Sequence, residues 1–169
     1  GKGTFVARHS RSRQRYQFSH IHDASGRQVF PGRELLAFGK GQADETVSGI
    51  LQLPRGENNP VYTLTMLSVD ERGPVSTLDI VLPAKLFAGL TAAAIRNAQE
   101  NLYAVYQDEC GVNVIRIEEH IHAALATAAE AKTLKIRPGS PVLRVERIAS
   151  TYRNLPVEFR TRVFDATRY

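Results

Sequence analysis

The last third of the chain alternates apolar and polar positions with the period of a β-strand. In residues 157–163 the apolar set is Val157, Phe159, Thr161 and Val163, and the charged set is Glu158, Arg160 and Arg162. Successive side chains of a strand point to opposite faces of a sheet, so this strand is expected to carry one apolar face and one charged face. We expect the chemistry of the protein on the charged face.

The strand belongs to a sequence pattern that occurs twice in the chain. From Pro141-Val142 to Pro156-Val157 the chain reads as strand, turn and strand, and the same reading holds from Pro60-Val61 to Pro74-Val75. Helix-compatible runs precede the two phrases at 43–51 and 123–134, and further strand candidates lie at 33–38 and 114–122. The sequence therefore predicts an α+β fold, an antiparallel sheet with helices packed against it, built from two β-α-β-β halves. Chance similarity of two hairpins is the alternative.

A helical segment is predicted to join the two halves. Leu102, Val105 and Tyr106 have the i, i+3, i+4 spacing of an amphipathic helix, and Gly111 is a suitable C-terminal stop. Cys110 has no second cysteine in the chain to pair with, which suits a reducing cytoplasm and excludes an internal disulfide framework. A lone cysteine at a helix end is more often a small buried hydrophobe than a nucleophile.

Composition narrows the class of protein. A chain of 169 residues is expected to form one domain, and it has no signal peptide and no apolar run near the roughly 20 residues that span a bilayer. The formal net charge is +5, and the first fifteen residues hold five basic side chains without an acid. Such an arm suits contact with a polyanion, but a solvated terminus explains an isolated run as well. We expect residues 1–15 to be a linker segment and residues 16–169 to be the domain.

Several short motifs, in this order and spacing, resemble one known family. They are Gly1-Lys-Gly-Thr-Phe-Val-Ala7, Leu53 with Gly56 and Val61, Gly73-Pro74-Val75, Leu82-Pro83 with Leu86 and Gly89-Leu90, Leu102-Tyr103 with Gly111, Ile121 and Ala123, Gly139-Ser140-Pro141-Val142-Leu143, Glu146-Arg147-Ile148, Pro156-Val157-Glu158, and Arg168-Tyr169. Together they resemble the effector-binding UTRA domain of GntR-type transcription regulators of the HutC subfamily.

The resemblance implies a chorismate-lyase-like fold and a homodimer that senses a small-molecule effector. It also implies that operator DNA is bound by a separate winged helix-turn-helix domain, which is absent here. Residues 1–7 look like the wing of that domain. No catalytic residue and no cofactor is implied.

Family positions also predict a ligand site. The Arg-x-Arg that grips phosphate in sugar-phosphate-sensing members falls on Met66-Leu67-Ser68, and three acidic or basic family positions fall on Leu78, Asp165 and Thr167. These departures argue against a sugar phosphate. The candidate ligand-binding residues are Arg33, Ser68, His120, His122, Glu158, Arg160 and Phe164. A pocket rich in histidine and arginine favours an anionic metabolite, since arginine pairs with carboxylates through two bonds.

Other readings stay open from the sequence. Arg160 and Arg162 could face solvent, and Glu158 could form an internal ion pair. The pairs His20/His22 and His120/His122 could bind zinc, but three or four ligands are needed and no metal is predicted. A chorismate-lyase-like enzyme acting on a small carboxylate, and a dimerisation module with a vestigial pocket, are the alternative functions.

Overall fold

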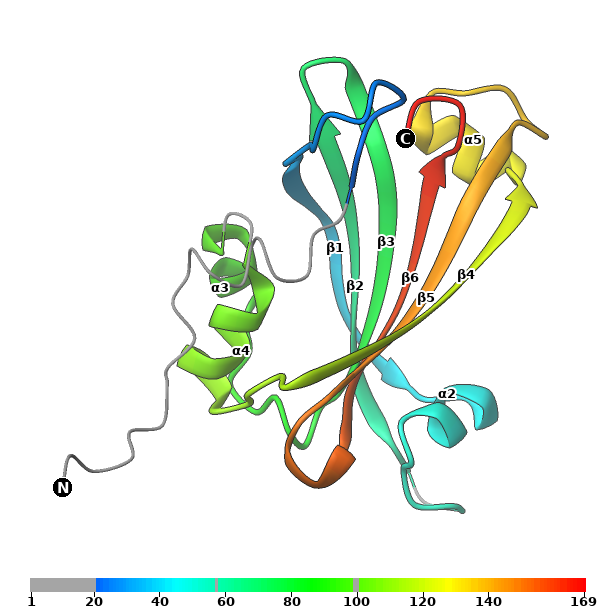
Figure 1. The fold of residues 1–169 in the computed structure, drawn as a ribbon. Helices are drawn as coiled ribbons and strands as arrows, with labels where there is room; N and C mark the ends of the chain where they lie inside the picture. The colour runs from blue at the N-terminus through cyan, green and yellow to red at the C-terminus, as the bar shows by residue number, and fades with distance from the viewer. Residues whose placement is uncertain (1–20, 57, 99–100) are drawn as a thin grey trace, which may run out of the picture.

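The computed structural model describes residues 21–56, 58–98 and 101–169. Its centre is a six-stranded sheet in the order β1-β2-β3-β6-β5-β4, in which every neighbouring pair is antiparallel (Figure 1). The strands are β1 (Gly32–Gln42), β2 (Pro60–Asp70), β3 (Gly73–Pro83), β4 (Arg116–Leu125), β5 (Pro141–Ser150) and β6 (Pro156–Asp165). The helices are α2 (Glu45–Ile50), α3 (Ala92–Asn97), α4 (Leu102–Cys110) and α5 (Ala128–Leu134), with a 3₁₀ turn, η1, at Tyr152–Asn154.

The two predicted halves are confirmed. β1, α2, β2 and β3 form one β-α-β-β unit, β4, α5, β5 and β6 form the other, and α3 and α4 connect them. The units meet where β3 pairs with β6, so the strand with the charged face lies at the centre of the sheet. A central strand has neighbours on both sides, which excludes the reading of Arg160 and Arg162 as residues of a solvent-facing edge.

One helix is shorter than its predicted run. Residues 123–125 continue β4, and α5 begins only after Thr127, whose hydroxyl accepts a bond from the Glu130 N–H while the Glu130 carboxylate accepts one from the Thr127 N–H. This capping box marks the helix start. The alanine-rich residues before Thr127 are compatible with either a strand or a helix, so they do not predict where the helix begins.

Helices cover both faces of the sheet at different places. The largest core cluster joins α3 and α4 to the first half, with Phe87 and Tyr106 fully buried against Leu64, Leu78 and Ile80. α5 packs on the other face, where Leu134 contacts Val142 and Val163. Figure 1 shows α3 and α4 together on one side and α5 beside the C-terminus. Within the described ranges, none of these helices has the length and apolar character needed to cross a membrane.

The predicted end of the connecting segment is also confirmed. Gly111 adopts a left-handed conformation with φ 68° directly after α4, and its N–H donates to the Gln107 carbonyl. Glycine takes this conformation without a steric penalty, so the helix ends where the sequence predicts. The predicted wing, the basic linker and His20 lie outside the described residues.

Candidate functional site

A cavity of about 300 Å³ opens on one face of the second half of the sheet. Its apolar lining consists of Ile21, Ile121, Leu143, Val145 and Phe164. Its charged lining consists of Glu119, Arg147, Arg160 and Arg162, and His22 and Tyr169 complete the wall. The volume is at the lower end of the range typical of small-molecule sites, so a compact ligand fits it best.

Strand register explains why these residues meet. Directly paired residues of neighbouring strands lie on the same face. Arg160 on β6 pairs with Arg147 on β5, and Arg147 pairs with Glu119 on β4. These three charged side chains therefore form a row across the three strands. The next row along the sheet consists of Leu78, Arg162, Val145 and Ile121, so Arg162 has apolar neighbours on both adjoining strands.

Glu158 anchors the charged face beneath α4. Its carboxylate is fully buried and accepts hydrogen bonds from the Tyr106 hydroxyl at 2.7 Å, the Arg160 guanidinium at 2.9 Å and the Tyr103 hydroxyl at 3.3 Å. Burial and the adjacent carboxylate raise the pKa of Tyr106 well above its usual value, so both tyrosines remain protonated donors. The ion pair that the sequence left open as an alternative role for Glu158 is therefore present.

Arg160 and Arg147 are both paired. Burial is the largest single influence and lowers the pKa of Arg160, but the Glu158 carboxylate, together with Tyr103 and Tyr106, raises the pKa above its usual value overall. Arg147 contacts the Glu119 carboxylate at 2.6 Å and donates to the Tyr103 hydroxyl at 3.4 Å. These two guanidiniums thus have internal partners of opposite charge, and their positions are fixed by the fold.

Arg162 is different. Its side chain lines the cavity and the residue is only 7% exposed, yet among the described residues its Nε and Nη2 atoms have no hydrogen-bond partner. Its guanidinium lies 5.1 Å from the centre of the Phe164 ring. Burial and the nearby guanidinium of Arg33 are the largest causes that lower the pKa of Arg162 well below its usual value. A buried cation without an acceptor is costly, and such groups are rare outside functional sites.

Arg33 and Ser68 lie on the same face, towards the other edge of the sheet. Arg33 pairs with Ser68, Ser68 with Ser76, and Ser76 with Phe164, so the register joins them to the cavity wall in one row. Burial and the Arg160 guanidinium lower the pKa of Arg33 to about 10. Neither Arg33 nor Ser68 lines the cavity itself.

The two histidines of β4 lie on the opposite face. His120 pairs with Glu146 and His122 with Arg144, and all four alternate with the residues that line the cavity. Both histidines are exposed. The two predicted ligand residues His120 and His122 therefore do not line this cavity with Arg160, because the odd-numbered residues of β4 face it. Across the described ranges, no three side chains of histidine, cysteine, aspartate or glutamate gather as a metal site would require.

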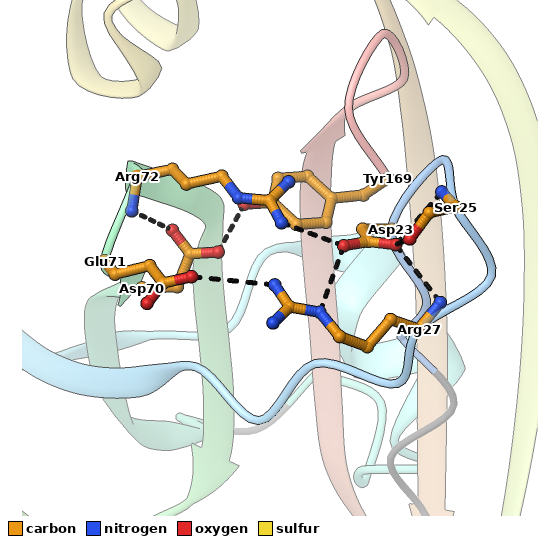
Figure 2. A network of polar contacts seen from close by, with 7 residues as sticks. All are labelled: Asp23, Ser25, Arg27, Asp70, Glu71, Arg72 and Tyr169. Atoms are coloured by element: carbon orange, nitrogen blue, oxygen red, sulfur yellow. Dashed lines mark hydrogen bonds and ion pairs between the residues drawn. The ribbon is translucent and has the colours of Figure 1, made fainter.

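The segment that leads into the domain forms part of the cavity wall. Ile21 and His22 line the cavity, and the next residue, Asp23, accepts bonds from the Ser25 hydroxyl at 2.6 Å and from Arg72 at 3.0 Å (Figure 2). Arg72 lies in the turn between β2 and β3. The bond from Ser25 lowers the pKa of Asp23 well below its usual range, although burial opposes the shift.

The C-terminus closes the same wall. The Tyr169 hydroxyl donates to Asp70 at 2.7 Å, and Arg168 donates to the Pro74 carbonyl at 2.6 Å and contacts Asp165 at 2.8 Å. Burial and the bond to Asp70 raise the pKa of Tyr169 to about 12. Figure 2 shows the contact of Arg72 with Asp23 and that of Tyr169 with Asp70, so the segment after residue 20, the β2–β3 turn and the chain end are held together.

The UTRA domain model matches residues 26–169. This chain belongs to the UTRA domain family. The fold agrees, since the crystal structure described as the ligand-binding domain of a GntR-family regulator from Bordetella bronchiseptica aligns with a TM-score of 0.76 and 28% identity. That alignment covers 81% of this chain and 85% of the other. The effector domain of PhnF from Mycobacterium smegmatis aligns with a TM-score of 0.70 and 26% identity, covering 80% of each chain.

Sequence relatives of this UTRA domain are transcription regulators. An uncharacterised HTH-type transcriptional regulator of Rhizobium meliloti is 29% identical over 99% of this chain and 68% of its own length. The HTH-type transcriptional repressor NagR of Bacillus subtilis is 23% identical over 100% of this chain and 68% of its own length. The chain is thus a UTRA domain of the kind found in GntR-family regulators, which is consistent with a ligand-sensing regulatory role.

Three charged residues of the cavity are absent from the predicted set of this UTRA domain. The sequence predicts Arg162 on the charged face but gives no reason to assign it to ligand binding. It assigns no ligand role to Glu119 or Arg147 either, although each is a single charge in an otherwise apolar stripe, with isoleucines at 117 and 121 and aliphatic residues at 143, 145 and 149. A lone charge on a core-facing stripe is a better signal for a site than histidines on a uniformly polar stripe, because the burial of a charge requires a partner.

Proposed function

We propose that this UTRA domain is the sensor of a bacterial transcription regulator, and that it binds a small anionic effector in the arginine-lined cavity. The observation that carries the proposal is Arg162, a buried guanidinium that lines the cavity with donors lacking an acceptor among the described residues. An anion supplies the missing acceptor and the compensating charge in one contact. A site built for a neutral ligand has no need of this buried cation.

Transmission to DNA would pass through the segment that precedes β1. Ile21 and His22 line the cavity, so an effector contacts the residues at which the chain enters the domain. Binding then favours one placement of the segment before residue 21, and with it one arrangement of a dimeric DNA-binding region. The shift in operator affinity cannot exceed the difference between the effector's affinities for the two arrangements.

Screening by thermal unfolding tests the sensor role. A ligand at ~100 times its dissociation constant stabilises the folded state by about 2.7 kcal/mol, which is readily measured. A library of anionic metabolites should contain a stabilising compound, and Arg162→Gln should abolish the shift. Arg116→Gln is the matched control, because Arg116 pairs with Glu118 on the exposed part of β4, away from the cavity.

A second experiment addresses the regulator as a whole. The full-length protein that carries this domain should bind DNA from its own upstream region with an affinity that changes when the stabilising anion is added, as measured by fluorescence anisotropy at fixed salt. Sedimentation should show a homodimer. A ligand that binds the cavity without changing DNA affinity contradicts the sensor role.

An enzyme on the same scaffold is the alternative. The charged cavity would suit a small carboxylate substrate, and incubation with chorismate followed by chromatography for 4-hydroxybenzoate tests it. The pairing of Arg160 with Glu158 and of Arg147 with Glu119 argues against it, since of the three described arginines that line the cavity only Arg162 forms no ion pair with a carboxylate. Product formation that depends on Arg162 would replace the sensor proposal.

A further inference from the structure

The cavity is divided into a charged part and an apolar part. Arg162 and Arg160 follow each other on the same face of β6, and Arg147 lies beside Arg160 on β5. On the other side of Arg162, the strands contribute only apolar side chains to the lining, from Val145, Ile121, Leu143 and Phe164, and His22 and Tyr169 complete the wall. The register fixes this division, since Leu143 pairs with Phe164 and Val145 with Ile121.

The charges of the lining leave little for a polyanion. Three guanidiniums, from Arg147, Arg160 and Arg162, line the cavity together with the Glu119 carboxylate. The Glu158 carboxylate, which bonds to Arg160, is fully buried and does not itself line the cavity. Two of the guanidiniums are bonded to those two carboxylates, so one positive charge remains, at Arg162. A ligand therefore has a single anchoring point for an anionic group.

The apolar part disfavours a polyhydroxylated ligand. A hydroxyl group placed against aliphatic side chains loses its bonds to water without gaining others, and this loss is unfavourable. A hydrocarbon body in the same place removes apolar surface from water on both partners. The Phe164 ring already stacks near Arg162, so the anchor and the apolar wall are contiguous.

We infer that the effector is an amphipathic organic anion, with one carboxylate or phosphate group on Arg162 and a compact apolar body against Ile121, Val145, Leu143 and Phe164. This inference rests on the proposed function, because it specifies the ligand of the same cavity. It assigns the specificity to two separate elements, the guanidinium of Arg162 and the aliphatic wall, and each can be changed independently.

Titration calorimetry with five simple probes tests the inference. Benzoate and phenyl phosphate carry both parts, benzamide has the body without the charge, acetate has the charge without the body, and glucose 6-phosphate has a charge on a hydroxylated body. We expect benzoate or phenyl phosphate, or both, to bind at least about tenfold more tightly than the other three probes. The stronger of the two identifies the anionic group as carboxylate or phosphate.

Two variants assign the contacts. Arg162→Gln should weaken the tighter probe by about tenfold or more, since a charge-assisted bond is lost. Ile121→Thr should weaken it as well while leaving acetate unaffected, and because Ile121 is 62% exposed the fold does not depend on it. Arg116→Gln, on the opposite face, should change neither.

The outcomes separate this inference from the proposed function. If glucose 6-phosphate or acetate binds as tightly as benzoate, or if Arg162→Gln leaves binding unchanged, the inference is overturned while a sensor of another ligand remains. If no probe binds and the metabolite screen yields only polar or neutral ligands, the inference is overturned too. If the probes bind as expected but no such ligand alters the DNA affinity of the full-length regulator, the proposed function fails instead.

Discussion

Replacement of Arg162 by methionine is expected to stabilise this domain. Arg162 is a buried cation with two donor atoms that have no acceptor among the described residues, and its neighbours on the adjoining strands are Leu78 and Val145. Leaving such a group unsatisfied costs about 1–3 kcal/mol, and more for a charge. A methionine of similar length fits the apolar surroundings and has no donors to satisfy.

One favourable contact is lost in the exchange. The guanidinium lies 5.1 Å from the centre of the Phe164 ring, and a cation–π contact of this kind contributes about 0.5–2 kcal/mol. Relief of the unsatisfied charge exceeds this loss, so Arg162→Met should raise the free energy of unfolding by about 1 kcal/mol. For a domain of this size the melting temperature should rise by roughly 2–4 °C.

The same substitution two residues earlier, Arg160→Met, should lower the free energy of unfolding instead of raising it. Arg160 is 3% exposed and its guanidinium bonds to the fully buried Glu158 carboxylate at 2.9 Å. Arg160→Met leaves that carboxylate without its counter-charge, which costs about 3–5 kcal/mol. Its melting temperature should fall by roughly 10 °C or more.

Urea unfolding followed by circular dichroism, with calorimetric melting in parallel, measures both variants without ligand. The pair is matched, because the two arginines lie on the same strand and the same face and are both buried. The reasoning is refuted if Arg162→Met destabilises the domain as much as Arg160→Met. That result would mean that Arg162 has a strong internal partner, and the case for an anion at that position would fail.

Three further substitutions test other parts of the site. Tyr106→Phe removes the 2.7 Å bond to the buried Glu158 carboxylate and should lower the free energy of unfolding by about 1.5–3 kcal/mol, measured in urea, whereas no loss would show that the bond contributes nothing. Asp23→Asn should destabilise the domain at pH 7, and the difference from wild type in melting temperature should shrink as the pH falls below about 4, because a depressed carboxyl pKa gives stability that is present above the unfolded-state value and lost below it. A constant difference between pH 7 and pH 2 would contradict this. Replacement of His120 and His122 together by alanine should leave effector affinity unchanged in titration calorimetry. A loss of affinity of tenfold or more would show that these histidines contribute to effector binding.

The repeated strand-turn-strand phrase predicts the architecture well. Hydrophobic alternation and Pro-Val positions placed all six strands in order, and β1, β2 and β3 repeat as β4, β5 and β6. The boundary between β4 and α5 was less predictable, because alanines at 123 and 124 suit either element and only the Thr127 cap resolves them. Local propensity therefore fixes the elements but not their ends.

Alternation also predicts the site on β6 but not on β4. On β6 the apolar and charged sets are distinct, so the face of Glu158 and Arg160 follows directly from the sequence. On β4 both sets contain a carboxylate, so alternation alone does not assign the ligand site to the isoleucine set with Glu119 or to the histidine set. Pairing with β5 decides this, because Glu119 lies opposite Arg147 while His120 lies opposite Glu146. The choice depends on register, a property of two strands together.

The two arginines of β6 show how one strand can serve both stability and binding. Arg160 belongs to a set of buried groups in which Glu158 supplies its counter-charge and Tyr103 and Tyr106 donate to the same carboxylate. Arg162 lies one step further along, beyond the reach of those partners and between apolar neighbours. A sequence selected for stability alone would place an aliphatic side chain at 162, as the facing residues Leu78 and Val145 do. A local choice that opposes the packing around it points to a function at that position. Arg162→Met is expected to gain stability and to lose anion binding. Measuring both quantities in this one variant therefore tests whether the arginine is kept for binding at a cost in stability.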